Sequence, residues 1–473
     1  MRRLLILLSV FALVASACGG GDDSTDTAAG EDTGTESESG SAPEEEPEAE
    51  AEPDEAEATD DETASSEPEE APADDNALGA LRVPQDYATI QEAVDAAAPG
   101  DLVLIDEGTY NESVVVETDN VVIRGVDRQT VVLDGMHSED MANGIIVFGN
   151  GVAVENLTVQ NYFSNGVFFT GDYDSDFILR GYRVSYVNAL NNRVYGIYAF
   201  NAEYGLIDNT YAAGHTDSGY YVGQCQPCSA VLSNNLSEYN TLAYSGTNAG
   251  GELYIVNNEF RMNRVGVTPN TLNSEELAPQ RSATFAGNWI HSNGNPETSK
   301  GGDIWELAYG VGMVLPGANN NLVTRNLIEN NRNGGVAVSF LPDGDTIWLA
   351  ENNTITDNVL RGNGIDVVMV DQGGQASLGN CFGGNTFDTS RPADIDTVLP
   401  CDGAEGDLSD MIGIDFFSPP GDEANVPYAD VASPAAGDQP SMPDALSAPA
   451  SPADVLPEFD GFDLDAIAVP SGT

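Results

Sequence analysis

Short runs of apolar residues alternate with Asn and Gly along the middle of the chain, and two patterns recur. The first is Asn-x-Φ-x-x-Asn, where Φ is an apolar residue, and its copies begin at Asn235, Asn258, Asn288, Asn326 and Asn353. The second is Gly-Φ-x-Φ, which begins at Gly166, Gly196, Gly219, Gly335 and Gly364. Successive copies mostly lie roughly 22 to 30 residues apart, and a period of that size predicts a solenoid.

One repeat fits one turn of a β-helix with three short strands. Residues 231–233, 236–239 and 242–246 are strand-like, and Asn234-Asn235 and Asn240 mark the bends between them. Asn and Gly suit such bends because they tolerate left-handed backbone angles. Asn side chains stacked in register can also hydrogen-bond from rung to rung. A β-propeller fits less well because its blades need about 40 residues, and the leucine-rich consensus of a horseshoe is absent.

A helix signal precedes the repeats. Thr89 and Glu92 have the spacing of a capping box. Four apolar residues then share one helical face: Ile90, Ala93, Val94 and Ala97. Pro99-Gly100 ends the helix, and a short helix with one apolar stripe is suited to cap the open end of a solenoid. The first strands are expected at 102–105, 113–116, 121–125 and 131–135.

Residues 89–94, 99–103, 108–112 and 121–125 resemble the beginning of right-handed parallel β-helix proteins of the pectin-lyase-like superfamily. The resemblance implies an all-β chain with a single-stranded right-handed parallel β-helix at 79–404. The group contains pectate lyases, pectin methylesterases, alginate epimerases, phage tailspikes and many secreted proteins of unknown role. Residues 219–225 are most similar to the last kind, for which the resemblance implies export, lipid anchoring and no established reaction.

The first 78 residues predict export and a tether. Arg2-Arg3, an apolar run up to Val14 and small residues before Cys18 form a signal peptide at 1–18. Cys18 is expected to be lipidated and to anchor the chain on the extracytoplasmic face of the cell membrane or at the cell surface, with ordinary cleavage after Ala17 as the alternative. Residues 19–78 are acidic and low in complexity, which predicts a disordered tether.

The chain is strongly acidic throughout. It has 77 Asp and Glu residues against 16 Lys and Arg residues, a formal net charge of −61. This charge disfavours nucleic acid and acidic polysaccharides as partners unless cations bridge them, and adaptation to a salty medium is the alternative reason for it. Residues 405–473 lose the repeat and become rich in Pro, Ala, Ser and Asp, which predicts a mostly disordered tail on a monomer. Residues 455–469 regain apolar side chains that could dock on a partner or fold back on the rod.

The remaining four cysteines form two pairs. An exported protein in an oxidising space is expected to form disulfides. Cys381 with Cys401 would close the last rung, and Cys225 with Cys228 would close a small loop. A redox role for the second pair and free thiols are the alternatives.

Alternation within Gly-Φ-x-Φ directs Phe168, Tyr198 and Tyr221 outward on three successive rungs, and Asp366 outward on a later one. An exposed aromatic row can bind sugar rings, whereas the alternative is a cross-rung stack that only stabilises the sheet. The resemblance implies that the ligand groove runs along this face.

The loops beside this face are longest at 268–283 and 294–309. The second loop supplies candidate binding residues, Trp305 and Tyr309, and candidate catalytic carboxylates, Asp303 and Glu306, to which Asp366 is added. A loop without a role is the alternative. His215, Asp217 and Ser218 do not indicate a catalytic triad, because neighbours on one loop rarely point at one another correctly.

Asp172, Asp174 and Asp176 alternate like the start of a Ca²⁺-binding loop. Phe177 and Arg183 stand where an EF-hand requires Gly and Glu, so only a looser Ca²⁺ site is a candidate, and no other cofactor is expected.

The sequence therefore favours a non-catalytic, lipid-anchored β-helix protein that binds a polysaccharide or a surface protein through its aromatic face. One alternative is a polysaccharide lyase, epimerase or hydrolase that uses carboxylates beside that face. Another is an accessory protein to an extracytoplasmic metal or redox enzyme.

Overall fold

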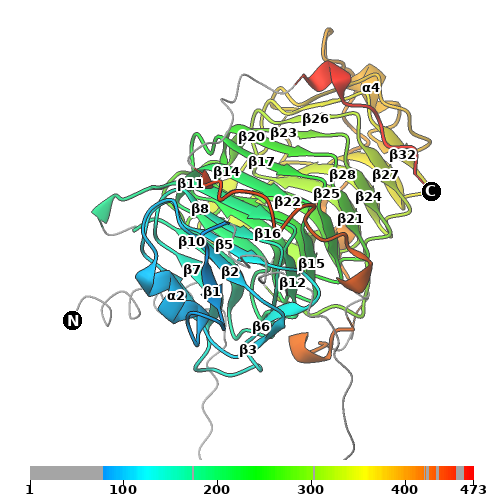
Figure 1. The fold of residues 1–473 in the computed structure, drawn as a ribbon. Coiled ribbons are helices and arrows are strands. Elements are labelled where there is room, and N and C mark those ends of the chain that lie inside the picture. Colours follow the sequence, from blue (N-terminus) through cyan, green and yellow to red (C-terminus); the bar gives the residue numbers. More distant parts are fainter. Residues whose placement is uncertain are drawn as a thin grey trace, which may run out of the picture. The chain divides into compact units, whose positions relative to one another are not determined.

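A computed structural model describes residues 78–472, apart from 173–174, 302–303, 376, 420, 422–424, 433–435 and 454–462. The predicted signal peptide, Cys18 and residues 19–77 of the predicted tether lie outside the described residues. The described chain winds as a right-handed parallel β-helix, in which each full rung adds one strand to each of three parallel sheets (Figure 1). No helix among the described residues is both long and apolar enough to cross a lipid bilayer.

Sheet A has 12 strands, all paired in parallel where their registers are given. In spatial order they are β1 (Leu81–Val83), β2 (Leu102–Ile105), β5 (Val122–Gly125), β8 (Val152–Glu155), β11 (Leu179–Ser185), β14 (Ala202–Asp208), β17 (Ala230–Ser233), β20 (Gly250–Val256), β23 (Arg281–Ala286), β26 (Leu322–Thr324), β31 (Thr354–Thr356) and β34 (Cys381–Gly383).

Sheet B has 10 strands and follows sheet A within each rung. They are β3 (Gly108–Tyr110), β6 (Val131–Asp134), β9 (Thr158–Gln160), β12 (Asn188–Leu190), β15 (Tyr211–Ala213), β18 (Leu236–Glu238), β21 (Glu259–Arg261), β24 (Trp289–His291), β27 (Leu327–Glu329) and β32 (Val359–Arg361).

Sheet C has 11 strands and contains the Gly-Φ-x-Φ segments. They are β4 (Val114–Val116), β7 (Asn143–Val147), β10 (Asn165–Thr170), β13 (Ile197–Phe200), β16 (Ser218–Gly223), β19 (Leu242–Thr247), β22 (Val265–Asn270), β25 (Val311–Pro316), β28 (Gly334–Ser339), β33 (Ile365–Met369) and β35 (Ser390–Arg391). A hairpin of β29 (Leu341–Asp343) and β30 (Thr346–Trp348) is inserted after β28.

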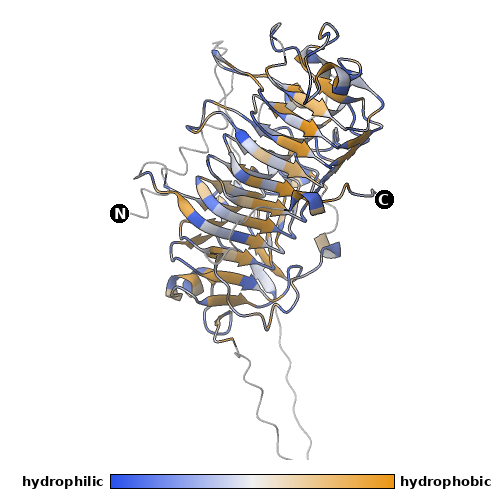
Figure 2. Ribbon diagram, turned by 90° about the horizontal axis from the view of Figure 1, so that it is seen from above, coloured by the Kyte–Doolittle hydropathy of each residue, from blue (hydrophilic) through white to orange (hydrophobic). Residues whose placement is uncertain are grey.

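The inward side chains of the three sheets form one continuous apolar core. On sheet C, Val167, Ile197, Tyr220 and Tyr244 stack in register on successive rungs, and all are fully buried. Apolar residues, coloured orange, recur on strand after strand along the stack (Figure 2). Strands of three to seven residues suffice for most rungs because each is paired on both sides along the stack.

Rows of Asn side chains run along the bends, as the repeat predicts, two long rows on either side of sheet B and a shorter row of Asn321, Asn353 and Asn380 before sheet A. In the row between sheets A and B, the Oδ1 atom of each Asn accepts a hydrogen bond from the backbone N–H of its counterpart one rung earlier, at 2.9–3.1 Å. Its members are Asn235, Asn258, Asn288, Asn326, Asn358 and Asn385. The row between sheets B and C repeats this geometry, with Asn240, Asn263, Asn293, Asn331 and Asn363.

The left-handed backbone lies one residue before each of these Asn positions. Asn234 has a φ of 57° and Asn257 a φ of 56°, but Tyr239 and Met262 adopt 59° and 53° in the second row. The Asn rows are therefore selected for their side-chain amides. The bends force left-handed geometry on whichever residue comes just before, at some conformational strain.

Both ends of the β-helix are closed. The predicted cap is α2 (Ile90–Ala96), where the Thr89 hydroxyl accepts from the Glu92 N–H at 3.1 Å and Ile90 is buried against the first rung. At the other end, α4 (Ile395–Val398) packs on β34. Both predicted disulfides are present, Cys225–Cys228 in a buried loop and Cys381–Cys401 at the last rung.

The segment after residue 404, predicted to be mostly disordered, is placed against the β-helix in its described parts. It contains the 3₁₀ turns η2 (Ile414–Phe417), η3 (Tyr428–Asp430), η4 (Ala436–Asp438) and η6 (Leu464–Ala466). Side chains of the β-helix donate hydrogen bonds to its carbonyls, among them Asn191 to Tyr428 and to Val431, both at 2.8 Å. Composition does not reveal such contacts because the donors belong to distant rungs.

Candidate functional site

The predicted aromatic row is present on sheet C. Phe168, Tyr198 and Tyr221 occupy the same register position of β10, β13 and β16. The rings of Phe168 and Tyr198 stack with centroids 4.3 Å apart, and Tyr221 meets Tyr198 edge-on at 4.8 Å. Tyr195, just before β13, adds a fourth ring, 4.5 Å from Tyr198 and 4.9 Å from Tyr221.

This row is not an open platform. Phe168 is 7 % exposed and Tyr221 is 4 % exposed, whereas Tyr195 and Tyr198 are partly exposed. Residues 271–280, part of the first of the two long loops predicted beside this face, supply Glu275, which accepts a hydrogen bond from the Tyr221 hydroxyl. Tyr195 and Tyr198 are therefore the rings most accessible to a ligand.

Side chains of earlier rungs hold this loop in place. The Asn248 amide donates to the carbonyls of Leu272 and Glu275 at 2.7 and 3.1 Å, and its oxygen accepts from the Leu272 N–H. The Gln226 amide donates to the carbonyls of Leu277 and Pro279, each at 2.8 Å. The position of Glu275 is thus set by the β-helix rather than by the loop alone.

The carboxyl group of Glu275 has a raised pKa and a buried oxygen atom. Burial raises its pKa to about 8, although hydrogen bonds from Tyr221 and from the backbone of Gln224 oppose the rise. Its Oε2 atom is buried and has no hydrogen-bond partner within the described chain. At neutral pH this side chain is mostly protonated and can donate a proton or a hydrogen bond.

Asp217 contacts the same group of rings through Tyr195. It accepts a hydrogen bond from the Ser218 hydroxyl at 2.7 Å and another from Tyr195, and burial raises its pKa to about 6. The pKa of Tyr198 is raised well above its ordinary value. Burial is the largest cause, and the carboxyl groups of Glu275 and Asp217 add to it, so both carboxyl groups act on this ring. We call Phe168, Tyr195, Tyr198, Tyr221, Asp217 and Glu275 the aromatic–acidic patch.

His215 does not take part in this patch. It is fully buried, its Nδ1 and Nε2 atoms contact the carbonyls of Asn192 and Ala189, and its own N–H donates to Asn240. Burial lowers its pKa to about 4, so it stays neutral in the row of amides. The expectation that His215, Asp217 and Ser218 form no triad agrees with this geometry.

The second loop lies beside Asp217, but its candidate Tyr309 is not on the surface. The backbone of Gly301 approaches the Thr216 carbonyl so closely that a side chain would not fit. The prediction of Tyr309 as a surface residue is wrong: it is fully buried, and its hydroxyl donates to the Gly294 carbonyl at 2.9 Å and accepts from Arg332. Its ring packs in the apolar cluster around β25 and β28, which keeps it from solvent.

Of the remaining candidates in this loop, Glu306 lies exposed in α3 (Ile304–Ala308). Asp303 lies outside the described residues, and so does the side chain of Trp305. Their predicted roles stay predictions.

The prediction that Asp366 faces outward is also wrong. Asp366 lies on β33 beside Gly335 of β28 and is 1 % exposed. Its carboxylate accepts from Asn363 and from the backbone N–H groups of Asp388 and Thr389 at 3.0 Å. It therefore ends the amide row between sheets B and C, and it is not available for catalysis.

The Ca²⁺ candidates remain untested as a set because Asp174 lies outside the described residues. Asp172 accepts a hydrogen bond from Ser175, and Asp176 is exposed with a φ of 56°. In the described parts of the chain, no three His, Cys, Asp or Glu side chains are grouped to hold a metal ion.

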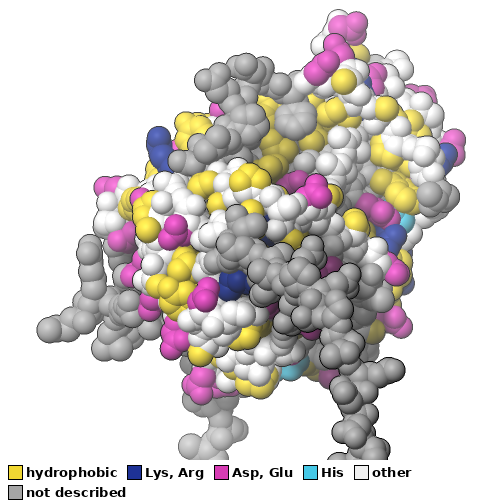
Figure 3. Space-filling model, in the orientation of Figure 1, with side chains coloured by type: hydrophobic (Ala, Val, Ile, Leu, Met, Phe, Trp, Pro, Cys, Tyr) yellow, Lys and Arg dark blue, Asp and Glu magenta, His cyan; other side chains and the backbone are white. Residues whose placement is uncertain are grey.

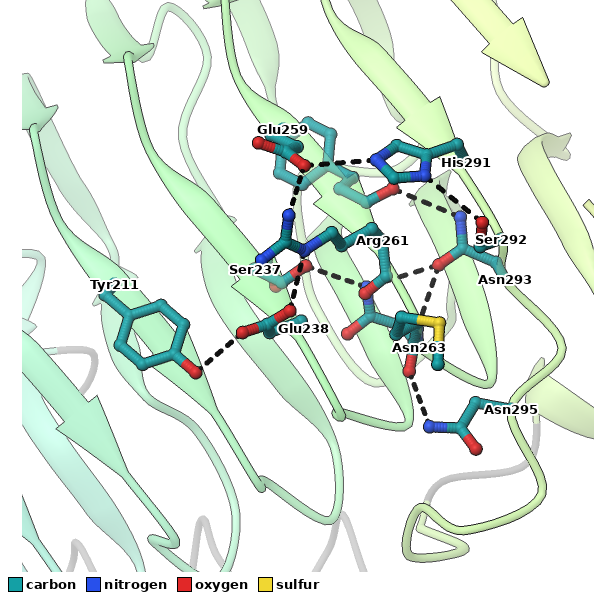
Figure 4. A network of polar contacts seen from close by, with 12 residues as sticks. Tyr211, Ser237, Glu238, Glu259, Arg261, Asn263, His291, Ser292, Asn293 and Asn295 are labelled. Atoms are coloured by element: carbon teal, nitrogen blue, oxygen red, sulfur yellow. Dashed lines mark hydrogen bonds and ion pairs between the residues drawn. The ribbon is translucent and has the colours of Figure 1, made fainter. Parts of the chain in front are cut away.

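Sheet B carries a second polar network on its outer face (Figure 4). The Tyr211 hydroxyl donates to Glu238, and Arg261 bridges Glu238 and Glu259 at 2.7 Å each. His291 contacts Glu259 at 3.1 Å. Both carboxylates thus have partners on neighbouring strands, which is the arrangement of a stabilising cross-strand ladder.

A cavity of about 690 Å³ opens beside this network. Leu236 and Trp289 line it from sheet B, and Gln439 and residues 468–470 line it from the C-terminal segment. Glu259 and Arg261, which line the cavity, are already paired within the network, so the aromatic–acidic patch is the better candidate for a ligand site. Acidic side chains are scattered over the face in Figure 3, with few Lys or Arg among them.

No family model and no curated protein matches the sequence. Solved structures do match the fold. The A-module of mannuronan C-5 epimerase AlgE6 of Azotobacter vinelandii has 16 % identity and a TM-score of 0.46, covering 67 % of this chain and 97 % of its own. The AlgE4 A-module of the same organism has 17 % identity and a TM-score of 0.42, covering 67 % and 95 %. A pectate lyase has 14 % identity and a TM-score of 0.38, covering 67 % and 76 %. The likeness is one of fold.

Sequence reasoning missed both carboxyl groups of the patch. The length of the 268–283 loop and its place beside the aromatic row were the available signals for Glu275. Asp217 directly precedes a Gly-Φ-x-Φ strand, and Tyr195 directly precedes another, so the bend before the strand was the position to examine.

Proposed function

We propose that this protein binds a neutral glycan at the aromatic–acidic patch. The observation that carries the proposal is the meeting of Tyr195 and Tyr198, both partly exposed, with the carboxyl groups of Asp217 and Glu275. Tyrosine rings can pack on the C–H faces of sugars, while carboxyl and phenol oxygens can bond sugar hydroxyls.

The charge of the chain favours one class of glycan. A net charge of −61 repels anionic polymers over long range, and no cationic side chain belongs to the patch as defined. Neutral polysaccharides avoid this repulsion. We therefore expect binding that depends little on salt.

The test is binding of the soluble chain from residue 19 to a panel of neutral and acidic polysaccharides. Tyr198→Ala should weaken binding about 3- to 10-fold, since one aromatic contact is worth about 0.5–1.5 kcal/mol. Tyr204→Ala is the matched control, because Tyr204 is 42 % exposed on β14 of sheet A. Absence of binding to every neutral glycan, or equal loss in both variants, would reject the proposal and direct attention to a surface protein as partner.

A second candidate, a polysaccharide hydrolase, is favoured by one specific observation. Glu275 and Asp217 have pKa values of about 8 and 6, so at neutral pH one is mostly protonated and the other mostly ionised. Two carboxyl groups whose pKa values differ in this way can act as general acid and general base. Glu275 would protonate the leaving glycosidic oxygen, and Asp217 would take a proton from the water that attacks the anomeric carbon.

Product analysis separates the two candidates. A hydrolase would release shorter saccharides from a bound glycan, and Glu275→Gln would abolish release while binding persists. Binding without any product would leave glycan recognition alone.

A further inference from the structure

Part of the C-terminal segment crosses the β-helix with little regular secondary structure of its own. Residues 436–453, which we call the strap, pass from the bend between sheets A and B onto the outer face of sheet A, in the orange-red part of Figure 1. Between η4 and residue 452, all of it described, the strap has turns at 443–447 and no helix or strand. Its position is therefore decided by what the β-helix offers to it.

Arg124 of β5 is the central contact. Its Nη1 donates to the carbonyls of Ala445 and Ala448 at 3.2 and 2.7 Å, and its Nη2 donates to the carbonyl of Pro449 at 3.2 Å. Its Nε pairs with Glu155 at 2.7 Å. The side chain is 1 % exposed, so one buried guanidinium binds three carbonyls of the strap.

Arg128 holds the first part of the strap in the same way. Its Nη1 donates to the Pro440 carbonyl at 2.8 Å, while its Nη2 donates to the Val187 carbonyl of the β-helix at 2.9 Å. Arg128 is fully buried, and burial lowers its pKa to about 10. The amide of Gln129 adds a bond to the Gln439 carbonyl.

The strap also bonds through its own N–H groups. Met442 donates to the Asn156 side chain at 2.7 Å, and Ala453 donates to the Gly151 carbonyl, just before β8, at 2.8 Å. These two bonds lie near the two ends of the strap, on either side of the Arg124 contact.

Small side chains complete the fit. Ala453 is fully buried and Ala445 is 6 % exposed. Ala450 packs on the apolar cluster that contains Leu102 and Val122. The surface thus recognises backbone carbonyls and small side chains.

We propose that this face of sheet A is a binding surface for an Ala- and Pro-rich segment, and that residues 436–453 are its built-in ligand, held reversibly. The observed occupant decides which segment the surface takes: Arg124 and Arg128 bind four backbone carbonyls of the strap, and the Ser441 hydroxyl donates to Asp127 and to Gln129. Attachment to the same chain keeps the local concentration of the ligand high and the surface filled.

The test uses the full chain and a labelled synthetic peptide of residues 436–453. Ala445→Glu with Ala453→Glu places two charges where the strap is buried, and should displace it. The peptide should then bind this double variant at least 10-fold more tightly than the unsubstituted chain, and adding Arg124→Gln should remove most of that binding. Leu446→Glu is the matched control, because Leu446 is 64 % exposed and its substitution should leave the strap in place.

Hydrogen exchange of the unsubstituted chain gives an independent readout. The N–H groups of Met442 and Ala453 should exchange faster than those of core strands such as β10, since the strap leaves without unfolding of the rungs. Exchange at the same slow rate as the core, or no peptide binding to a double variant that keeps its β-sheet circular dichroism, would overturn the proposal.

Discussion

The amide row between sheets B and C shows how much a single residue type decides. Each Asn accepts from the preceding rung and donates to the next: Asn293 receives the Asn263 N–H at 3.0 Å, and its own N–H and side-chain amide donate to Asn331 at 3.1 and 2.9 Å. His215 replaces an Asn within the row, and Asp366 ends it, because each offers an acceptor in the same place. The row therefore selects for an acceptor at a fixed position, and Asn supplies a donor as well.

Asn293→Ala should lower the free energy of unfolding by about 1–3 kcal/mol, because buried N–H and carbonyl groups lose their partners. Urea unfolding followed by circular dichroism measures this. Asn111→Ala, which removes an exposed hydrogen bond to the Asp134 carbonyl, should change it by no more than about 0.5 kcal/mol. Equal effects in the two variants would contradict the role of the row.

Glu275 should make stability fall as pH rises. Burial raises its pKa from 4.5 to about 8, so between these values the folded chain holds more protons than the unfolded chain. The free energy of unfolding therefore decreases with pH across this window. Asp217, with its pKa raised from 3.8 to about 6, adds to the decrease at the acidic end.

Glu275→Gln should flatten this decrease, most clearly between about pH 6 and 8, where Asp217 no longer contributes much. Urea titrations at a series of pH values measure the slope. Glu276→Gln changes the exposed neighbouring residue and should keep the original slope. An unchanged slope in Glu275→Gln would show that this carboxyl group titrates normally.

Among the elements, short strands form the rod and carry the aromatic row, whereas a loop supplies Glu275. Residues 271–280 reach the aromatic row because Asn248 and Gln226 of preceding rungs bind their carbonyls. The loop is thus an ordered part of the patch. Removing its anchors should loosen it without unfolding the rungs.

Asn248→Gly tests this while allowing the left-handed backbone at that position, where φ is 48°. Exchange of the N–H groups in residues 272–277 should become at least about 10-fold faster, because the loop then opens locally. Asn257→Gly is the control, as Asn257 is exposed and also left-handed, with a φ of 56°. Faster exchange in both variants would assign the effect to backbone flexibility.

For the molecule as a whole, the C-terminal segment is part of the folded unit. It covers Arg124 and Arg128 and contributes Ile467 to an apolar cluster with Val231 and Val256. A fragment that ends at residue 404 would expose these surfaces to water. The predicted boundary at 404 separates two kinds of sequence, but contacts continue across it.

Deletion of residues 405–473 should lower the melting temperature by about 2–5 °C or more, because the apolar and hydrogen-bonding contacts of the segment are lost. Differential scanning calorimetry measures the change. The Ala445→Glu with Ala453→Glu variant should reproduce part of it, whereas Leu446→Glu should not. An unchanged melting temperature after deletion would show that the segment contributes nothing to stability.

Much of the rod could be predicted from particular residues. The spacing of Asn258, Asn288 and Asn326 indicated the rungs, Thr89 with Glu92 indicated the cap, and the register of Phe168, Tyr198 and Tyr221 followed from strand alternation. Tyr309 and Asp366 were misplaced for a physical reason. Tyr309 was expected at the surface because it belongs to a long loop, but an apolar cluster covers it; Asp366 was placed by alternation, which no longer decides burial at the end of the amide row.

The order of residues was enough to predict the β-helix, its cap, its aromatic row and its two disulfides, because these depend on periodicity and on residues close to one another along the chain or on successive rungs. Which carboxyl groups join the row, and where the C-terminal segment lies, became known only from the folded chain. Glu275 meets Tyr221 across 54 residues, and Arg124 meets Ala445 across 321. No local pattern encodes such meetings, since they arise from the stacking of rungs and from the burial that follows.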